Sequence, residues 1–279
     1  MKNISYFMLI LMSFTFFASC DEDDPMDPIV EERNIVQTAQ ATAELSTLVA
    51  ALQRAGLVDA LNADGPFTVL APNNDAFQRL LDSNDDWDSL EDIDVDLLTD
   101  VLLFHVMSGE VKAADLTTTY VNTLSTGPND EAVSLRINTT DGVIFNGAAK
   151  PLTTDVETTN GIVHIIDEVM IPPGIVGIAS TNDDFSILVA ALTRADLNTD
   201  YLSVLNGEGP FTVFAPTNGA FEALLAGNDE WNALADIPVE TLEAVLNYHV
   251  VSGANVQSDE LTNNQVVTTL GGNVTIDTS

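Results

Sequence analysis

A thirteen-residue phrase occurs twice in this chain, as GPFTVLAPNNDAF at residues 65–77 and as GPFTVFAPTNGAF at residues 209–221. The same offset of 144 residues relates His105 to His249, so the match persists well beyond the phrase itself. A repeat of this length indicates the duplication of one structural unit. The chain is therefore predicted to contain the same fold twice.

The match also extends upstream of the phrase. STLVAALQRAGL at residues 46–57 corresponds to SILVAALTRADL at residues 186–197, now with an offset of 140. The second copy thus carries four additional residues between Leu197 and Gly209. They fall in a polar stretch, where the entropy of closing a longer loop rises slowly with length, so we interpret residues 198–208 as a variable loop.

The N-terminus has the features of an export signal. Lys2 precedes an apolar run over residues 6–17, followed by FASC ending at Cys20. The run is too short for a bilayer core of about 30 Å, which takes roughly 20 residues. The FASC phrase resembles the lipobox of bacterial lipoproteins, which implies a signal peptide over residues 1–20 and lipidation of Cys20, the single cysteine. The alternative is an ordinary signal peptide with an incidental cysteine.

Residues 21–33 begin with DEDDPMDP. An acidic, proline-containing segment buries little apolar surface and is predicted to form a disordered tether. Acids directly after the lipidated cysteine resemble the surface-export signal of Bacteroidetes lipoproteins. The resemblance implies an outer-membrane lipoprotein displayed on the cell surface; a solvated linker on a periplasmic lipoprotein is the alternative.

The charge balance limits the partners. The sequence has 43 acidic residues against 8 lysines and arginines, a formal net charge of −35. It lacks the cations that neutralise a phosphate backbone, which excludes ordinary nucleic-acid binding, and membrane contact is expected only through the lipid anchor. A strongly acidic protein stays soluble at high salt, and divalent cations can bridge it to other anionic surfaces. We expect no cofactor, with calcium possible as a bridging ion.

Patterns in the first copy predict helices followed by strands. Helical spacing indicates helices over residues 34–40 and 45–57, and a short buried strand at residues 67–70 is stopped by Pro72. Asn73 or Asn74 then caps a further helix. The remaining expected elements are a helix over residues 96–106 and antiparallel strands around residues 133–137, 143–145 and 161–167. This order is typical of an α+β domain.

Three phrases of the first copy together resemble the fasciclin family. They are GPFTVLAPNNDAF, LLFHVMSGEV at residues 102–111 and GIVHIIDEVMIP at residues 161–172. The resemblance implies two fasciclin-like domains, at residues 34–174 and 175–279. Each is expected to be an α+β fold, a β-wedge or sandwich with helices packed around it.

The second copy departs from this pattern at its end. A counterpart of residues 161–172 is expected near residue 305, but the sequence ends at Ser279. The second domain therefore lacks its C-terminal strands, and the alternating residues Val274 and Ile276 are expected to form an unpaired edge. We interpret this as truncation; completion by a partner's strand is the alternative.

The family resemblance supplies a candidate adhesion motif. A tyrosine-histidine pair at this place in the family is associated with integrin-type cell binding. It maps onto Tyr248 and His249, and onto Phe104 and His105 with the hydroxyl missing. The residues alone favour a different role, because a histidine late in an amphipathic helix is usually a core or capping residue. His164 is expected to be structural, on one face of a strand.

The remaining motifs indicate no enzyme. The sequence has no G-x-S-x-G phrase, and Cys20 is assigned to the lipid. The acids at residues 92–96 alternate like the start of a calcium loop, but Leu97 and Leu103 stand where the loop requires glycine and a bidentate acid, so we expect these acids to cap the next helix.

We therefore expect a non-enzymatic, surface-anchored adhesion module whose partners are extracellular proteins or glycans. The alternative is an envelope lipoprotein that binds a glycan or a small ligand. A ligand site would show a concave pocket with a few convergent polar groups, whereas an adhesive module would present a broad patch strengthened by repetition.

Overall fold

The computed structural model describes residues 32–127, 130–207 and 209–278, and a folded unit begins at Arg33. The predicted signal peptide with Cys20 lies outside the described residues, as does the tether up to residue 31. Below, residues 33–174 are called the first copy and residues 175–278 the second copy.

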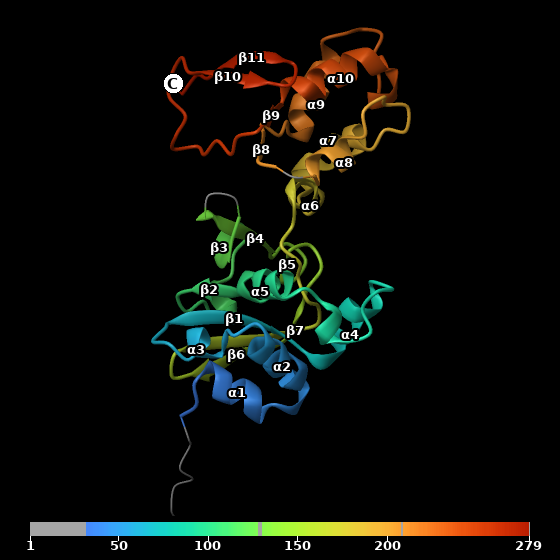
Figure 1. The fold of residues 1–279 in the computed structure, drawn as a ribbon. Helices are drawn as coiled ribbons and strands as arrows, with labels where there is room; N and C mark the ends of the chain where they lie inside the picture. The colour runs from blue at the N-terminus through green and yellow to red at the C-terminus, as the bar shows by residue number, and fades with distance from the viewer. Residues whose placement is uncertain (1–31, 128–129, 208, 279) are drawn as a thin grey trace, which may run out of the picture. The chain divides into compact units, whose positions relative to one another are not determined.

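The first copy starts with helices and continues with strands (Figure 1). Its helices are α1 (Ile35–Ala41), α2 (Ser46–Arg54), α3 (Val58–Leu61), α4 (Asn74–Asp82) and α5 (Val95–Phe104), with 3-10 turns at Ala43–Leu45, Leu90–Asp92 and Ala113–Asp115. Its strands are β1 (Phe67–Pro72), β2 (Val106–Ser108), β3 (Thr119–Thr126), β4 (Ala132–Asn138), β5 (Ile144–Phe145), β6 (Pro151–Thr158) and β7 (Gly161–Ile166). The predicted α+β class is confirmed.

Local signals set the ends of several helices. The side chain of Asn73 accepts the N–H of Ala76 and caps α4, and Asp94 accepts the N–H groups of Asp96 and Leu97 at the start of α5. The predicted cap at residues 73–74 is confirmed, and one of the acids at residues 92–96 does cap a helix. The predicted end of α5 at residue 106 is wrong, because the helix ends at Phe104 and Val106 begins strand β2, which pairs with β1.

A four-stranded sheet in the order β2-β1-β7-β6 forms the centre of the first copy. Strand β1 runs antiparallel to β2 and parallel to β7, with Phe67 opposite Gly161 and Pro72 opposite Ile166. The expectation of purely antiparallel strands is therefore wrong for β7. Long sequence separation between β1 and β7 permits the parallel pairing, because a crossover connection can be accommodated.

Strand β7 joins the two cores of the first copy. All six of its residues are buried. Val163 and Ile165 pack with the helices α1, α2, α4 and α5, while Ile166 packs with Phe104 and with strands β4 and β5. The sequence GIVHII is apolar except for His164, and a nearly continuous apolar run is typical of a strand buried on both faces.

Glycine at position 161 permits the close approach of β1 and β7. Gly161 has φ +152, and a Cβ atom there would lie 2.0 Å from the carbonyl oxygen of Phe67. No side chain fits at that distance, so the glycine at the start of β7 is required by the pairing itself.

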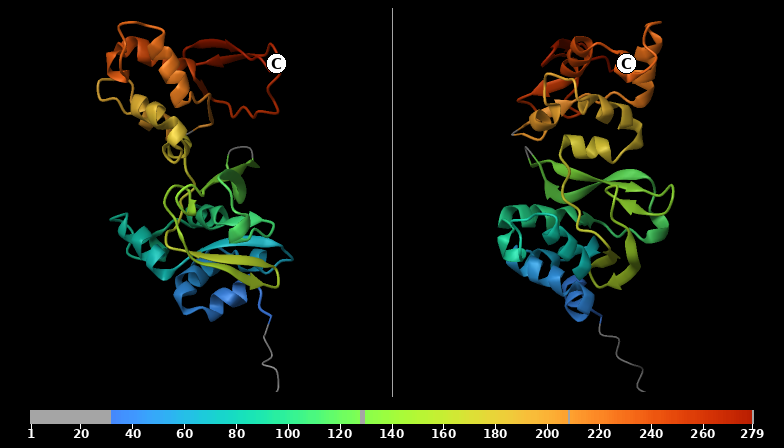
Figure 2. Two further views of the ribbon diagram at one scale, coloured as in Figure 1. Left: turned by 180° about the vertical axis from the view of Figure 1, so that it is seen from behind. Right: turned by 90° about the vertical axis from the view of Figure 1, so that its right-hand side faces the viewer.

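The second copy repeats the first part of this architecture. Its helices are α6 (Ile175–Ser180), α7 (Ser186–Leu192), α8 (Tyr201–Leu205), α9 (Asn218–Ala226) and α10 (Val239–Tyr248), with 3-10 turns at Asp183–Phe185 and Leu234–Asp236. Its strands are β8 (Phe211–Val213), β9 (Val250–Ser252), β10 (Val266–Thr269) and β11 (Gly272–Thr275). Figure 2 shows these elements from two further sides.

Matching hydrogen bonds show that the copies share their local design. The side-chain oxygen of Asn74 accepts the N–H of Thr47 at 2.9 Å, and that of Asn218 accepts the N–H of Ile187 at 2.9 Å. Each bond ties an early helix of its copy to the helix that follows the first strand. In each copy a threonine of the first strand also donates its hydroxyl to a backbone carbonyl.

One expectation for the second copy is wrong, and another is met in part. The inserted segment 198–208 is not simply a variable loop, because it contains helix α8, whose Tyr201 is buried and donates its hydroxyl to Asn247 at 3.0 Å. The expected unpaired edge is met on one side only: Val274 lies in β11, which pairs with β10, and the other edge of β11 has no strand partner among the described residues. Strand β11 forms an antiparallel hairpin with β10, in which Val274 lies opposite Val267.

No helix within residues 32–127, 130–207 and 209–278 is both long and apolar enough to cross a membrane.

Candidate functional site

The first-copy half of the predicted adhesion motif is buried. Phe104 and His105 lie at the C-terminal end of α5, and neither reaches the surface of the folded domain. His105 Nε2 accepts the N–H of Met170 at 2.9 Å, so the ring proton is on Nδ1, which donates to the carbonyl of Val101 at 2.6 Å. A neutral imidazole thus connects helix α5 to the segment that follows β7.

Burial also determines the protonation of His105. It lowers the pKa of His105 from 6.5 to about 4, against the smaller opposing effect of the hydrogen bond to Val101. The neutral ring is therefore part of the folded state at neutral pH. A partner that meets the folded first copy does not contact this side chain.

His164 also has a structural position. It is fully buried in β7, with Nε2 2.9 Å from the carbonyl oxygen of Val111 and Nδ1 accepting the N–H of Asp155 at 3.2 Å. Since Nδ1 accepts, Nε2 carries the proton and donates to Val111. The ring joins β7 to β6 and to the chain after β2, in agreement with the role expected from the sequence.

The second-copy half of the motif is different. Tyr248 is 44% exposed at the end of α10, and its hydroxyl donates to the carbonyl of Asn273 in β11 at 2.7 Å. This bond holds the ring against the hairpin of β10 and β11 and leaves the rest of the side chain accessible. The adhesion motif therefore stays a prediction, with Tyr248 as its accessible member.

His249 is half-buried next to Tyr248. Its Nδ1 donates to the carbonyl of Val245 at 2.7 Å. Among the described residues none forms a hydrogen bond with its Nε2, unlike the equivalent atom of His105.

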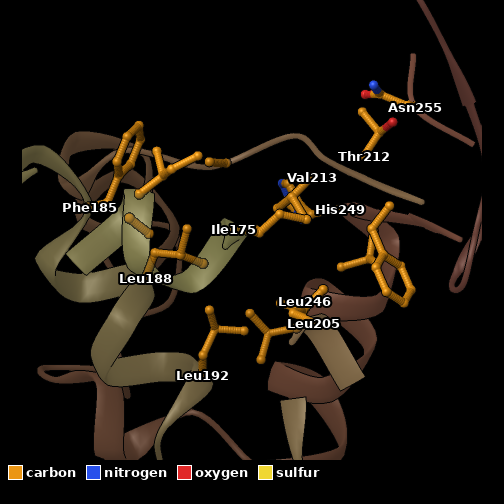
Figure 3. A pocket seen from close by; sticks show the side chains of 15 residues that line it. Ile175, Phe185, Leu188, Leu192, Leu205, Thr212, Val213, Leu246, His249 and Asn255 are labelled. Carbon is orange, nitrogen blue, oxygen red and sulfur yellow. The ribbon is translucent and has the colours of Figure 1, made fainter. Parts of the chain in front are cut away.

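His249 lines a cavity of about 250 Å³ in the second copy. Figure 3 shows leucines from α7, α8 and α10 grouped on one side of it, with Thr212 and Asn255 at another. His249 also lines a further cavity of about 290 Å³, bounded by Phe221 and Leu224 of α9. The two cavities are mainly apolar with a few polar groups, the combination typical of a binding site.

The described parts of the chain contain no group of three or more His, Cys, Asp or Glu side chains placed to hold one ion. Two carboxylates are instead paired with guanidinium groups, Glu168 with Arg79 at 3.1 Å and Asp196 with Arg194 at 2.6 Å.

Residues 43–172 and 183–279 both match the family described as Fasciclin domain. The chain belongs to the Fasciclin domain family. The resemblance inferred from the three phrases is thereby confirmed for both copies, with a shorter match in the second. The family match points to no enzyme class.

Relatives with Fasciclin-type similarity occur in bacteria and animals. Protein sll1483 of Synechocystis sp. is 38% identical over 139 residues, which is 50% of this chain and 73% of the relative. Human periostin is 28% identical over 245 residues, 84% of this chain and 26% of periostin. Rat Stabilin-2 is 29% identical over 226 residues, 76% of this chain and 15% of the relative. The chain thus spans a minor part of these animal proteins.

Among solved structures, the chain is similar to a FAS1 domain pair from the insect cell adhesion molecule Fasciclin I. That alignment covers 84% of this chain and 85% of the insect chain, with a TM-score of 0.45 and 17% identity.

The sequence analysis singled out no residue of the two cavities except His249, because their linings come from α7, α8, α9 and α10, which lie apart in the sequence.

Proposed function

We propose that this protein is a non-enzymatic adhesion module, anchored at the cell surface through a lipid on Cys20, that binds extracellular proteins or glycans. The observation that carries the proposal is the presence of two Fasciclin domains in one chain. Two linked copies of one domain raise the effective concentration at a second contact, which suits attachment to a repetitive surface.

Charge supports a calcium-assisted mode of attachment. The net charge of −35 disfavours direct contact with other acidic surfaces, and divalent cations can bridge two such surfaces. Cation bridging needs no dedicated metal cage, because many weak carboxylate contacts contribute together.

A second candidate function is the binding of a glycan or small ligand by an envelope lipoprotein. The cavity of about 250 Å³ at His249 favours it, since its apolar walls are combined with the polar residues Thr212 and Asn255. A ligand held there would be bound by one domain, without any need for the pair.

Beads that carry the full chain are expected to be retained on immobilised extracellular-matrix proteins in the presence of calcium and released by a chelator. The expected loss on chelation is about tenfold or more, because calcium offsets the repulsion between acidic surfaces. Retention is measured by bead counting under flow. Selective retention on a single glycan of an array, indifferent to calcium, would instead support the second candidate.

The variant Tyr248→Ala is expected to weaken that attachment by roughly tenfold, the usual effect of removing a tyrosine anchor from an interface. Tyr120→Ala is the matched control, because Tyr120 is 43% exposed and lies in the first copy, outside the predicted motif. Circular dichroism checks that both variants fold. Equal loss of attachment in the two variants would argue against the adhesion motif.

A further inference from the structure

The dipeptide Asn-Gly occurs four times in the sequence, at residues 146–147, 160–161, 206–207 and 218–219. In this dipeptide the backbone nitrogen of glycine can attack the carboxamide carbon of asparagine, because glycine has no side chain to hinder the approach. The attack requires a backbone N–H that can lose its proton and a carboxamide that can turn toward it. The structure therefore decides which of the four pairs can react.

The carboxamides of Asn160 and Asn218 are held in place. Each makes three hydrogen bonds of 2.8–3.0 Å to other segments of its copy. The partners of Asn160 are Ile35, Leu61 and Ala63, and those of Asn218 are Ile187, Asp183 and Ser186. Neither carboxamide can turn toward the next residue unless these bonds break together.

The pair Asn206-Gly207 lies at the end of helix α8. Both residues are exposed, but the N–H of Gly207 donates to the carbonyl of Val204 at 3.2 Å. A hydrogen-bonded backbone N–H loses its proton only after local opening, as amide hydrogen exchange shows in general. The attacking nitrogen of this pair is therefore protected in the folded chain.

The pair Asn146-Gly147 forms the turn that follows β5 and has neither form of protection. Gly147 is exposed, and none of the described residues accepts its N–H. The carboxamide of Asn146 makes a single long hydrogen bond, from Nδ2 to the carbonyl oxygen of Ile171 at 3.4 Å. This pair thus meets both requirements of the attack.

We propose that Asn146 is a site of spontaneous deamidation. The backbone nitrogen of Gly147 loses its proton to hydroxide and forms a bond with Cγ of Asn146. The bond between Cγ and Nδ2 breaks, and the departing amine takes up a proton from water and leaves as ammonia. Water then opens the cyclic imide at one of its two carbonyls. One opening gives aspartate, and the other gives isoaspartate, in which the main chain passes through Cγ.

Either product loses the connection between this turn and the segment after β7. A carboxylate has no proton to donate to the carbonyl oxygen of Ile171, so two oxygens that repel each other replace the hydrogen bond. Isoaspartate also adds a backbone carbon to a turn that is closed by two hydrogen bonds between Phe145 and Ala149, at 2.8 and 3.0 Å. Deamidation therefore adds a negative charge and loosens the turn.

Labelling with heavy oxygen tests the reaction directly. The full chain is kept folded in a mildly alkaline buffer made with water enriched in heavy oxygen, which enters the product when the imide opens. Digestion in ordinary water and mass spectrometry then locate the label. We expect it to accumulate at residue 146 about tenfold or more faster than at residues 160, 206 and 218, because those pairs must first open locally. Chromatography should resolve the labelled peptide into two forms of equal mass, aspartate and isoaspartate.

The same experiment in guanidinium chloride is the control for local sequence. Without tertiary contacts the four Asn-Gly pairs are expected to take up label at similar rates. Two results would overturn the proposal. One is a rate at residue 146 of the folded chain that does not exceed the rates at the other three asparagines. The other is a residue 146 that takes up label in guanidinium chloride but not in the folded chain.

The variant Asn146→Asp reproduces one product and tests its consequence. Asn146 has φ +48, a left-handed conformation that aspartate tolerates as asparagine does, so the turn itself can still form. We expect the urea midpoint of the first copy to fall, because the hydrogen bond to Ile171 is lost. The midpoint is read from the fluorescence of Trp87 in chains that also carry Trp231→Phe.

Asn138→Asp is the matched control for the added charge. Asn138 also lies in the first copy, and its Oδ1 accepts the N–H of Thr140 at 2.9 Å, a bond that aspartate can keep. We expect this variant to lower the urea midpoint less than Asn146→Asp does. Equal shifts in the two variants would contradict the structural role given to the bond between Asn146 and Ile171.

Discussion

Replacing Phe77 with alanine is expected to lower the free energy of unfolding of the first copy by about 3–5 kcal/mol, the usual cost of truncating a buried aromatic side chain. Phe77 is 0% exposed and packs in the core that joins helices α1, α2, α4 and α5 to β1 and β7. Strand β7 closes this core, so the neighbours cannot collapse fully into the space that the ring leaves.

The matched variant Phe221→Ala is expected to cost clearly less in the second copy. Phe221 is 2% exposed, but it already borders the cavity of about 290 Å³. Its neighbour Ala220 is exposed where Ala76 is buried. A side chain with fewer packed neighbours contributes less dispersion and creates less additional void when it is removed.

Urea unfolding can separate the two transitions, because each copy has one tryptophan. The variants are made in chains that keep only Trp87 or only Trp231, the other being replaced by phenylalanine. Fluorescence then reports on a single copy. Equal losses for the two alanine variants would mean that the second core is packed around Phe221 as tightly as the first is around Phe77.

Local chemistry accounts for the features that the sequence predicted well. The cap at Asn73 and the apolar run of β7 need only neighbouring residues to be recognised. Because the phrase at residues 65–77 recurs at residues 209–221, the strand and helix predicted in the first copy are also predicted in the second. These elements could be predicted from the sequence because residue propensity, hydrophobic pattern and tertiary environment all favour the same structure.

Tertiary context accounts for what the sequence did not predict. Residues 106–108 continue an apolar pattern that suits a helix, yet they form β2 because β1 offers an edge to pair with. The sequence predicts a loop at residues 198–208 because polar residues flank the short apolar stretch YLSVL on both sides, whereas in the structure Tyr201 and Leu205 anchor helix α8 in the core. A short helix of this kind is stabilised by packing more than by propensity.

For His105 the sequence predicts the local hydrogen bond but not the distant one. A position at the end of a helix indicated a capping role for His105, and the bond to Val101 four residues earlier agrees with it. The second partner, Met170, lies 65 residues further along the chain and has no local signal. His105 and His249 have no local difference for the same reason, since they differ in whether a distant residue meets Nε2.

Acidification is expected to destabilise the first copy through His105. The folded state keeps this imidazole neutral, since burial lowers its pKa from 6.5 to about 4. The unfolded chain binds a proton at this residue below pH 6.5, whereas the folded chain does not until about pH 4. Stability therefore falls as the pH decreases through this window, by about 3 kcal/mol in total, and His105 contributes no further change below it.

The variant His105→Gln isolates this contribution from that of the many carboxylates. Glutamine has no proton to gain, and the carboxylates are the same in both chains. The free energy of unfolding is measured from pH 7 to pH 4 for the unchanged chain and for the variant. On acidification we expect the free energy of unfolding of the unchanged chain to fall by about 3 kcal/mol relative to that of the variant. The reason is that only the unchanged chain has a histidine that takes up a proton when the chain unfolds.

A direct titration keeps the prediction testable even if glutamine disturbs the fold. The ring proton resonances of His105 are followed by NMR in the unchanged chain, and we expect no titration above about pH 5. A midpoint near 6.5 would show that the folded chain binds this proton as readily as the unfolded chain, and His105 would then make no contribution to the pH dependence of stability.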